Sequence, residues 1–111
     1  MLDLSTVKFG KALPRFDPRT LKLANYFTRE LPPPPKAVDW SANMTDLQMF
    51  LNDKIGSCTC ATIAHAVHSW TAENGNQIIL TDDAVLAAYE AVSGYDPMLP
   101  ETDRGAVVLD V

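Results

Sequence analysis

The strongest structural signal of this 111-residue chain lies in residues 52–75, NDKIGSCTCATIAHAVHSWTAENG. The first six residues have the composition of a turn, and Ser57 is a good helix N-cap. Apolar residues then recur at helical spacing, and Gly75 suits the position just after a helix end. The pattern predicts a helix over residues 58–74. Its expected core stripe consists of Cys60, Ile63, Ala64, Val67 and Trp70.

A second helix is expected after an apolar connector over residues 77–80. Thr81 is its predicted N-cap, Asp82 and Asp83 lie in its positive first turn, and Gly94 ends it. The expected buried face consists of Val85, Leu86, Tyr89 and Val92. A loop over residues 95–105 and an apolar helix from residue 106 to residue 111 follow. The predicted fold class is therefore mainly α with an extended N-terminal arm.

Prolines divide the chain before these helices. Pro14 and Pro18 break the first segment, in which residues 20–30 could form a short helix. Four consecutive prolines at positions 32–35 favour a stiff polyproline II connector. A spacer is preferred over a proline-rich ligand, because no PxxP repeat extends beyond this run. The predicted organisation is a basic N-terminal arm (1–31), a polyproline linker (32–36) and a helical subdomain (37–111).

Charge is divided at the same place. The whole chain has 9 Lys and Arg against 14 Asp and Glu, a net charge of −5. Residues 1–36 have a net charge of +4 and residues 37–111 a net charge of −9. The acidic body argues against nucleic-acid binding, and the basic arm suits an acidic protein partner or the body of its own chain. No apolar run long enough to span a membrane and no secretory signal pattern is present.

The two cysteines are the candidate chemical groups. Cys58 and Cys60 are too close in sequence for an unstrained disulfide, so both are expected as free thiols, which suits a reducing cytoplasm. Their spacing from His65 and His68 matches no common zinc site, so no metal or cofactor is expected. Cys58 falls in the first helical turn, where a thiolate is stabilised, and points about 200° away from Cys60. The alternative is that both cysteines serve as small hydrophobic residues.

The ordered set Val38-Asp39-Trp40, Asn52 and Gly56-Ser57-Cys58 resembles the start of the mature domain of papain-superfamily cysteine peptidases. In that family an oxyanion-hole Gln precedes the nucleophilic Cys of a Gly-Ser-Cys motif by six residues, the separation of Asn52 and Cys58. Residues 80–85 look like the start of the family's second helix. The chain is also similar to uncharacterised papain-like proteins of phages and bacteria with an Asn-Asp-x-x-Gly-x-Cys-Thr motif.

This resemblance implies the helical half of an α+β papain-like fold. It makes Cys58 the nucleophile and Asn52 an oxyanion-hole residue acting on a peptide or protein substrate. The family's catalytic His lies far downstream, and nothing in this sequence matches it. His65 lies about 10 Å along the helix from Cys58, and a general base must come within roughly 3.2 Å or act through one water. The base is therefore expected outside this chain.

Two functions follow from these patterns. One is a papain-like cysteine peptidase or related acyl-transfer hydrolase. The other is a catalytically inactive papain-like structural or interaction module, for example a phage-particle component that docks through residues 1–36 and would then be located in the virion. The final residues, AVVLDV, contain no helix-stop signal, so the subdomain over residues 37–111 is expected to be incomplete.

Overall fold

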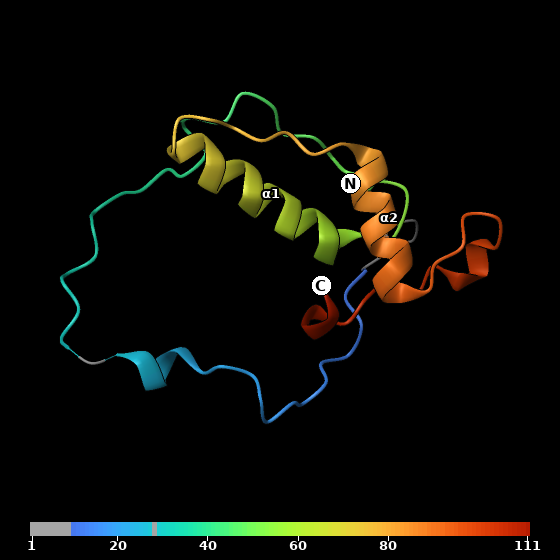
Figure 1. Ribbon diagram of the computed structural model, residues 1–111, viewed down its shortest axis with the longest axis horizontal. Coiled ribbons are helices and arrows are strands. Elements are labelled where there is room, and N and C mark those ends of the chain that lie inside the picture. Colours follow the sequence, from blue (N-terminus) through green and yellow to red (C-terminus); the bar gives the residue numbers. More distant parts are fainter. Residues whose placement is uncertain (1–9, 28) are drawn as a thin grey trace, which may run out of the picture.

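The computed structural model describes residues 10–27 and 29–111, which are mainly helical. Two α-helices, α1 (Cys58–Glu73) and α2 (Asp82–Ser93), lie on either side of a small core (Figure 1). The elements η2 (Leu23–Tyr26), η3 (Pro100–Thr102) and η4 (Val108–Asp110) are short 3-10 turns. The described residues contain no strand, and their only β pairings are isolated bridges. A mainly α fold is therefore confirmed at this level.

Helix α1 begins and ends close to the predicted residues, but its N-cap makes a different hydrogen bond. The Ser57 hydroxyl donates to the Phe50 carbonyl over 3.0 Å and does not cap the helix. At the other end, Gly75 has φ +77°, and its N–H donates to the Ala72 carbonyl. The N–H of Asn76 donates to the Thr71 carbonyl, which completes a Schellman motif.

The buried face of α1 differs from the predicted stripe. Ile63 and Trp70 are 48% and 65% exposed, so their assignment to the core was wrong, and Val67 is only half-buried. Cys60 and Ala64 of the predicted stripe are buried as expected, and they are joined by Ala61, His68 and Ala72. The reason is tertiary, because α2 and the loop before α1 pack against the small-residue side of the helix. A prediction from hydrophobicity alone places the side of α1 with the larger residues, Ile63 and Trp70, in the core.

Helix α2 agrees with its sequence pattern. The Thr81 hydroxyl accepts a hydrogen bond from the Ala84 N–H over 3.2 Å, and Gly94 has φ +72° in the left-handed region. Val85 and Tyr89 are buried, and Val92 packs at the edge of the core. Leu86, also expected on this face, is only half-buried and does not belong to the core. Strong local signals at both ends therefore predicted this helix and most of its buried face.

The loop that leads into α1 places an aromatic ring in the core. Phe50 and Leu51 have φ values of 53° and 60°, which reverse the chain and bring the Phe50 ring to 1% exposure. The ring centroid lies 4.9 Å from that of His65 and 5.3 Å from that of His68. This loop therefore closes the side of the core that α2 leaves open.

The start and the end of the described chain meet in a short parallel pairing. The N–H of Ala106 donates to the Gly10 carbonyl over 2.8 Å, and the Ala12 N–H donates to the Ala106 carbonyl over 2.9 Å. The expected helix over residues 106–111 was therefore wrong, since Ala106 is engaged in this bridge and only η4 is helical. Nearer the N-terminus, residues 1–9 of the predicted arm lie outside the described residues.

Residues 13–27 and 29–40, here called the arm loop, bow away from both helices (Figure 1). The helix expected over residues 20–30 was wrong, because only η2 forms there and none of its residues is buried. Short helices without a packing surface are unstable in water. The open loop helps to explain a radius of gyration of 16.8 Å, against about 13 Å for a compact chain of this length.

Candidate active site around Cys58

Cys58 is the first residue of α1, and its half-buried side chain lines a cavity of about 190 Å³. The first turn of a helix has backbone N–H groups without intrahelical partners, and these stabilise nearby negative charge. The cavity wall is mostly apolar and comes from three distant parts of the chain: Lys11, Cys58, Thr59, Thr62, Ile63, Val108 and Val111.

The backbone just before Cys58 is held by a hydrogen-bond network. The Gly56 N–H donates to Asp103 Oδ1 over 2.9 Å, and the Tyr89 hydroxyl donates to the same oxygen over 2.7 Å. The Gly105 N–H in turn donates to the Tyr89 hydroxyl over 3.0 Å. A Cβ on Gly56 would lie 2.9 Å from Asp103 Oδ1 and 3.1 Å from the Gly10 Cα, so only glycine fits.

This network keeps the Tyr89 hydroxyl protonated. Burial, with the hydrogen bond to Asp103, raises the pKa of Tyr89 to about 12. The side chain is fully buried. The phenol is therefore a hydrogen-bond donor at neutral pH, and it links α2 to the start of α1 through one carboxylate oxygen.

The second thiol has a different environment. Cys60 is 4% exposed and belongs to the hydrophobic core. Burial raises the pKa of Cys60 above its usual range, which favours the unreactive thiol form. Of the two free cysteines, Cys58 alone lines the cavity at the start of α1.

Asn52 lies in the exposed loop before α1, six residues before Cys58. Its backbone N–H donates to the Met49 carbonyl over 3.0 Å, which fixes a turn. Its side chain is not part of the wall of the Cys58 cavity. An oxyanion role for Asn52 therefore stays a prediction that rests on its spacing from Cys58.

Both histidines are engaged elsewhere in the fold. His65 Nε2 lies 2.8 Å from the Gln48 carbonyl and must donate to it, because a carbonyl only accepts. His68 is fully buried, and its Nε2 accepts the Leu80 N–H over 2.7 Å. Neither ring lines the cavity beside Cys58. They hold loops to α1, and neither is placed to take a proton from the thiol.

Sequence reasoning missed the residues that complete the cavity from the two ends of the chain. Lys11 reaches it through the bridge to Ala106, and Val108 and Val111 follow that bridge. No sequence signal identifies such pairings, since they join segments about 95 residues apart and depend on the folded body. Part of the basic N-terminal arm therefore contacts the body of its own chain.

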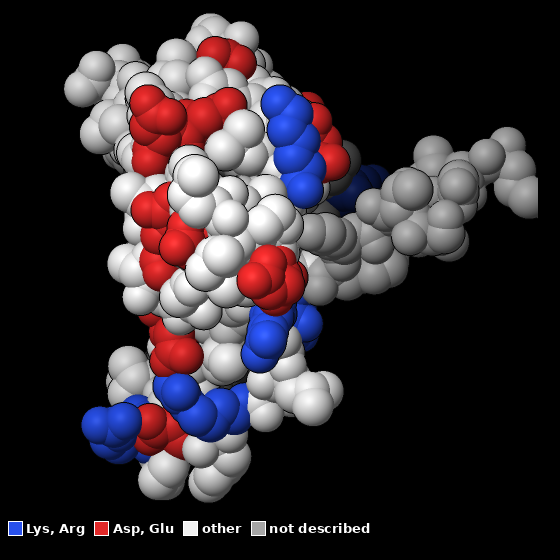
Figure 2. Space-filling model, turned by 90° about the vertical axis from the view of Figure 1, so that its right-hand side faces the viewer, with Lys and Arg blue, Asp and Glu red and all other residues white. Residues whose placement is uncertain are grey.

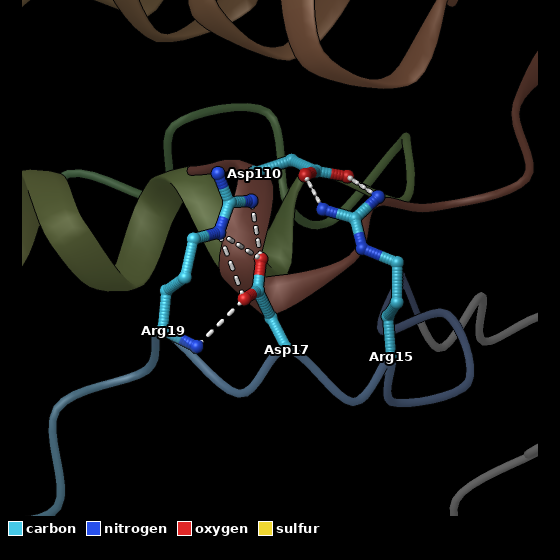
Figure 3. Close-up of polar contacts among 4 residues, drawn as sticks. All are labelled: Arg15, Asp17, Arg19 and Asp110. Carbon is cyan, nitrogen blue, oxygen red and sulfur yellow. Dashed lines mark hydrogen bonds and ion pairs between the residues drawn. The ribbon is translucent and has the colours of Figure 1, made fainter.

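An exposed ion pair accompanies this contact. The two guanidinium nitrogens of Arg15 bind the two carboxylate oxygens of Asp110, one of them over 3.3 Å (Figure 3). Beside it, Arg19 binds Asp17 and lowers the pKa of that carboxyl group. Exposed pairs contribute little stability. The Arg15 pair therefore orients the arm against η4, and the backbone bridge holds it.

Among residues 10–27 and 29–111, no three His, Cys, Asp or Glu side chains group closely enough to hold a metal ion. Within the same ranges, no helix has the length and apolar character needed to cross a membrane. No family model matches the chain, and neither a curated protein nor a solved structure matches it.

Proposed function

We propose that this chain carries the nucleophile of a papain-like cysteine peptidase or a related acyl-transfer hydrolase, on the helical half of an α+β papain-like fold. The observation that carries the proposal is the contrast between its two thiols. Cys58 starts the 16-residue helix α1 and lines an apolar cavity, whereas Cys60 is buried with a raised pKa. A reactive cysteine needs access to its substrate, and Cys58 at the cavity wall has this access whereas buried Cys60 does not.

In this reaction the Cys58 thiolate attacks the carbonyl carbon of a peptide or protein substrate. A carbon–sulfur bond forms, and the carbonyl electron pair moves to oxygen. The N–H of Cys58 and the side-chain amide of Asn52 are the proposed donors to this oxyanion. When the intermediate collapses, the carbon–nitrogen bond breaks and the amine leaves with a proton. Water then hydrolyses the thioester.

The thiol proton requires a base from beyond the described residues. His65 donates to Gln48, and His68 is fully buried, so neither is within reach of the cavity beside Cys58. The proposal therefore assigns to this chain the nucleophile, its helix and one wall of the substrate site. It assigns the general base to a segment that joins this wall in the longest natural form of the protein.

An electrophilic peptide probe tests this function on that longest form. We expect labelling of Cys58 many times faster than labelling of an unstructured cysteine peptide, and loss of labelling in Cys58→Ala. Cys60→Ala is the matched control and should label like the native protein once circular dichroism has shown that it folds. Labelling of Cys58 no faster than that of the free peptide would refute an enzymatic role.

A specific observation favours a second candidate, a catalytically inactive interaction module. The arm loop exposes large apolar side chains together with lysines and arginines, which suits a protein partner with an acidic surface. Triple charge reversal at Lys22, Arg29 and Lys36 leaves the bridge at Ala106 intact. It should abolish partner binding if the arm loop docks, and unchanged partner binding would refute this role.

A further inference from the structure

The arm loop combines two properties that rarely occur together on a solvent-facing segment. Large apolar side chains there are more than half exposed: Leu21, Leu23, Tyr26, Phe27 and Leu31. Lysine and arginine residues lie between and beside them, at positions 22, 29 and 36, together with one acidic residue, Glu30. Concentrated exposed apolar surface with a polar surround usually marks an interaction site. The loop thus has the composition of a ligand for an apolar groove with acidic surroundings.

The body of the chain has a groove of this kind. A groove of about 340 Å³ runs between α1 and α2, and its described lining is almost entirely apolar. Ile63 on α1 and Ala84, Ala88 and Ala91 on α2 line it and are exposed. An apolar groove left open between two helices can accept apolar side chains from another segment.

The charges of the two surfaces are complementary. Helices α1 and α2, which form both walls of the groove, contain four acidic residues and no Lys or Arg. The apolar segment of the arm loop carries Lys22 and Arg29 against Glu30. Figure 2 shows acidic side chains spread over the upper part of one face, while Lys and Arg gather mainly at its lower end. Opposite charge accelerates association and fixes orientation.

The arm loop is tied down at both ends, and none of its described residues lines the groove of its own chain. At one end Ala12 is bonded to Ala106, and at the other the Ser69 hydroxyl donates to the Trp40 carbonyl over 2.9 Å. Between these points the backbone of the loop bows outward (Figure 1). Its large apolar side chains are exposed to solvent. Because both ends of the arm loop are held, the loop reaches the α1–α2 groove of another molecule more readily than the groove of its own chain.

We propose that residues 21–27 and 29–31 of one copy dock in the α1–α2 groove of a second copy, and that the second copy reciprocates. A two-fold exchange of this kind uses the same pair of surfaces twice and closes without forming a filament. This inference builds on the second candidate function and names its partner. It does not depend on the chemistry of Cys58.

Sedimentation velocity of the full chain over a concentration series tests the inference. We expect a monomer–dimer equilibrium that weakens as salt is raised. Leu23→Asp with Phe27→Asp on the arm loop, and Ala88→Glu in the groove, should each raise the dissociation constant at least tenfold. Met98→Asp is the matched control, because Met98 is 85% exposed and lies outside both surfaces. It should associate like the native chain.

A photocrosslinking residue at position 27 identifies the contact directly. In a mixture of isotopically light and heavy chains, crosslinks from position 27 to residues 84–92 should join light to heavy chains. A chain that stays monomeric at all concentrations would overturn the inference, as would an Ala88→Glu variant that folds and associates normally. Crosslinks confined to single chains would overturn it as well.

Cys58→Ala should leave association unchanged, so failure of the thiol chemistry and failure of self-association are separate results.

Discussion

Asp103 Oδ1 accepts the Tyr89 hydroxyl over 2.7 Å, and the same oxygen accepts the N–H of Gly56 over 2.9 Å. One carboxylate oxygen therefore joins α2 to the backbone two residues before Cys58. These two hydrogen bonds connect a loop with little regular structure to the two α-helices that contribute to the core of the described residues. The position of the candidate nucleophile thus depends on a polar contact as well as on hydrophobic packing.

Replacement of Asp103 by alanine should destabilise the fold. The change leaves the Gly56 N–H and the Tyr89 hydroxyl without their acceptor, and each unpaired buried donor costs about 1–3 kcal/mol. We expect a loss of about 2–4 kcal/mol in the free energy of unfolding in urea, less than the full sum of about 2–6 kcal/mol, because two donors that share one acceptor are not independent. Asp96→Ala in the same loop is the control, and an equal loss there would show that the network has no special role.

Alkaline pH should weaken the fold through Tyr89. Its pKa is about 12 in the folded protein and 10.0 for an ordinary tyrosine. The raised pKa contributes stability below pH 10, and this contribution is lost as the pH rises toward 12 because the unfolded state releases its proton first. The loss should approach 2–3 kcal/mol, at about 1.4 kcal/mol per unit of pKa. The Tyr89→Phe variant should have a lower free energy of unfolding at neutral pH, and this free energy should fall less steeply as the pH rises from 10 to 12.

Gly105 and Gly75 offer a matched pair of glycine substitutions. Both have positive φ, +76° and +77°, but a Cβ at Gly75 meets no atom within 4 Å, whereas one at Gly105 would clash with the Gly10 backbone. Gly75→Ala should cost about 1–2 kcal/mol from backbone strain alone. Gly105→Ala should cost more and should also speed hydrogen exchange at the Ala12 N–H. Equal effects of the two variants on exchange would contradict the close packing against Gly10.

The two thiols should differ in alkylation by iodoacetamide. Cys58 is half-buried at the cavity wall, and Cys60 is 4% exposed with a pKa raised by burial. In the native protein we expect Cys58 to be modified many times faster, as measured by peptide mass spectrometry. In concentrated urea the rates should become similar, because the environments become the same. Equal alkylation rates of the two cysteines in the native protein would mean that the core around Cys60 opens readily.

His68 should be replaceable by leucine but not by alanine. Its ring fills the core, so His68→Ala leaves a cavity and removes the acceptor of the Leu80 N–H, at a cost of about 2–4 kcal/mol. His68→Leu also removes the acceptor of the Leu80 N–H, but it refills the volume and removes Nδ1, a buried atom without a hydrogen-bond partner. Thermal unfolding should therefore show leucine closer than alanine to the native chain, and equal losses would contradict this explanation.

Local signals predicted the two long helices. Thr81 caps α2, Gly94 and Gly75 end the helices with positive φ, and Val85 and Tyr89 face the core. These features need only the residues within one or two turns, so the amino-acid sequence states them directly. The position of Cys58 at the start of α1 follows from the same local rules.

Contacts between distant segments decided the remaining features. The orientation of α1 depends on where α2 and Phe50 pack, and so Ile63 and Trp70 are exposed despite their hydrophobicity. Lys11 pairs with Ala106, and this pairing brings Lys11, Val108 and Val111 to the Cys58 cavity and takes the place of the start of an expected helix.

By itself, then, the sequence determined the two helices, their ends, the position of Cys58 and the division of charge. Only the tertiary structure decided which side of α1 is buried, what surrounds the thiol and why the arm loop stays open. The physical reason is that hydrogen bonding within a helix is local, whereas burial depends on which surfaces the whole chain brings together.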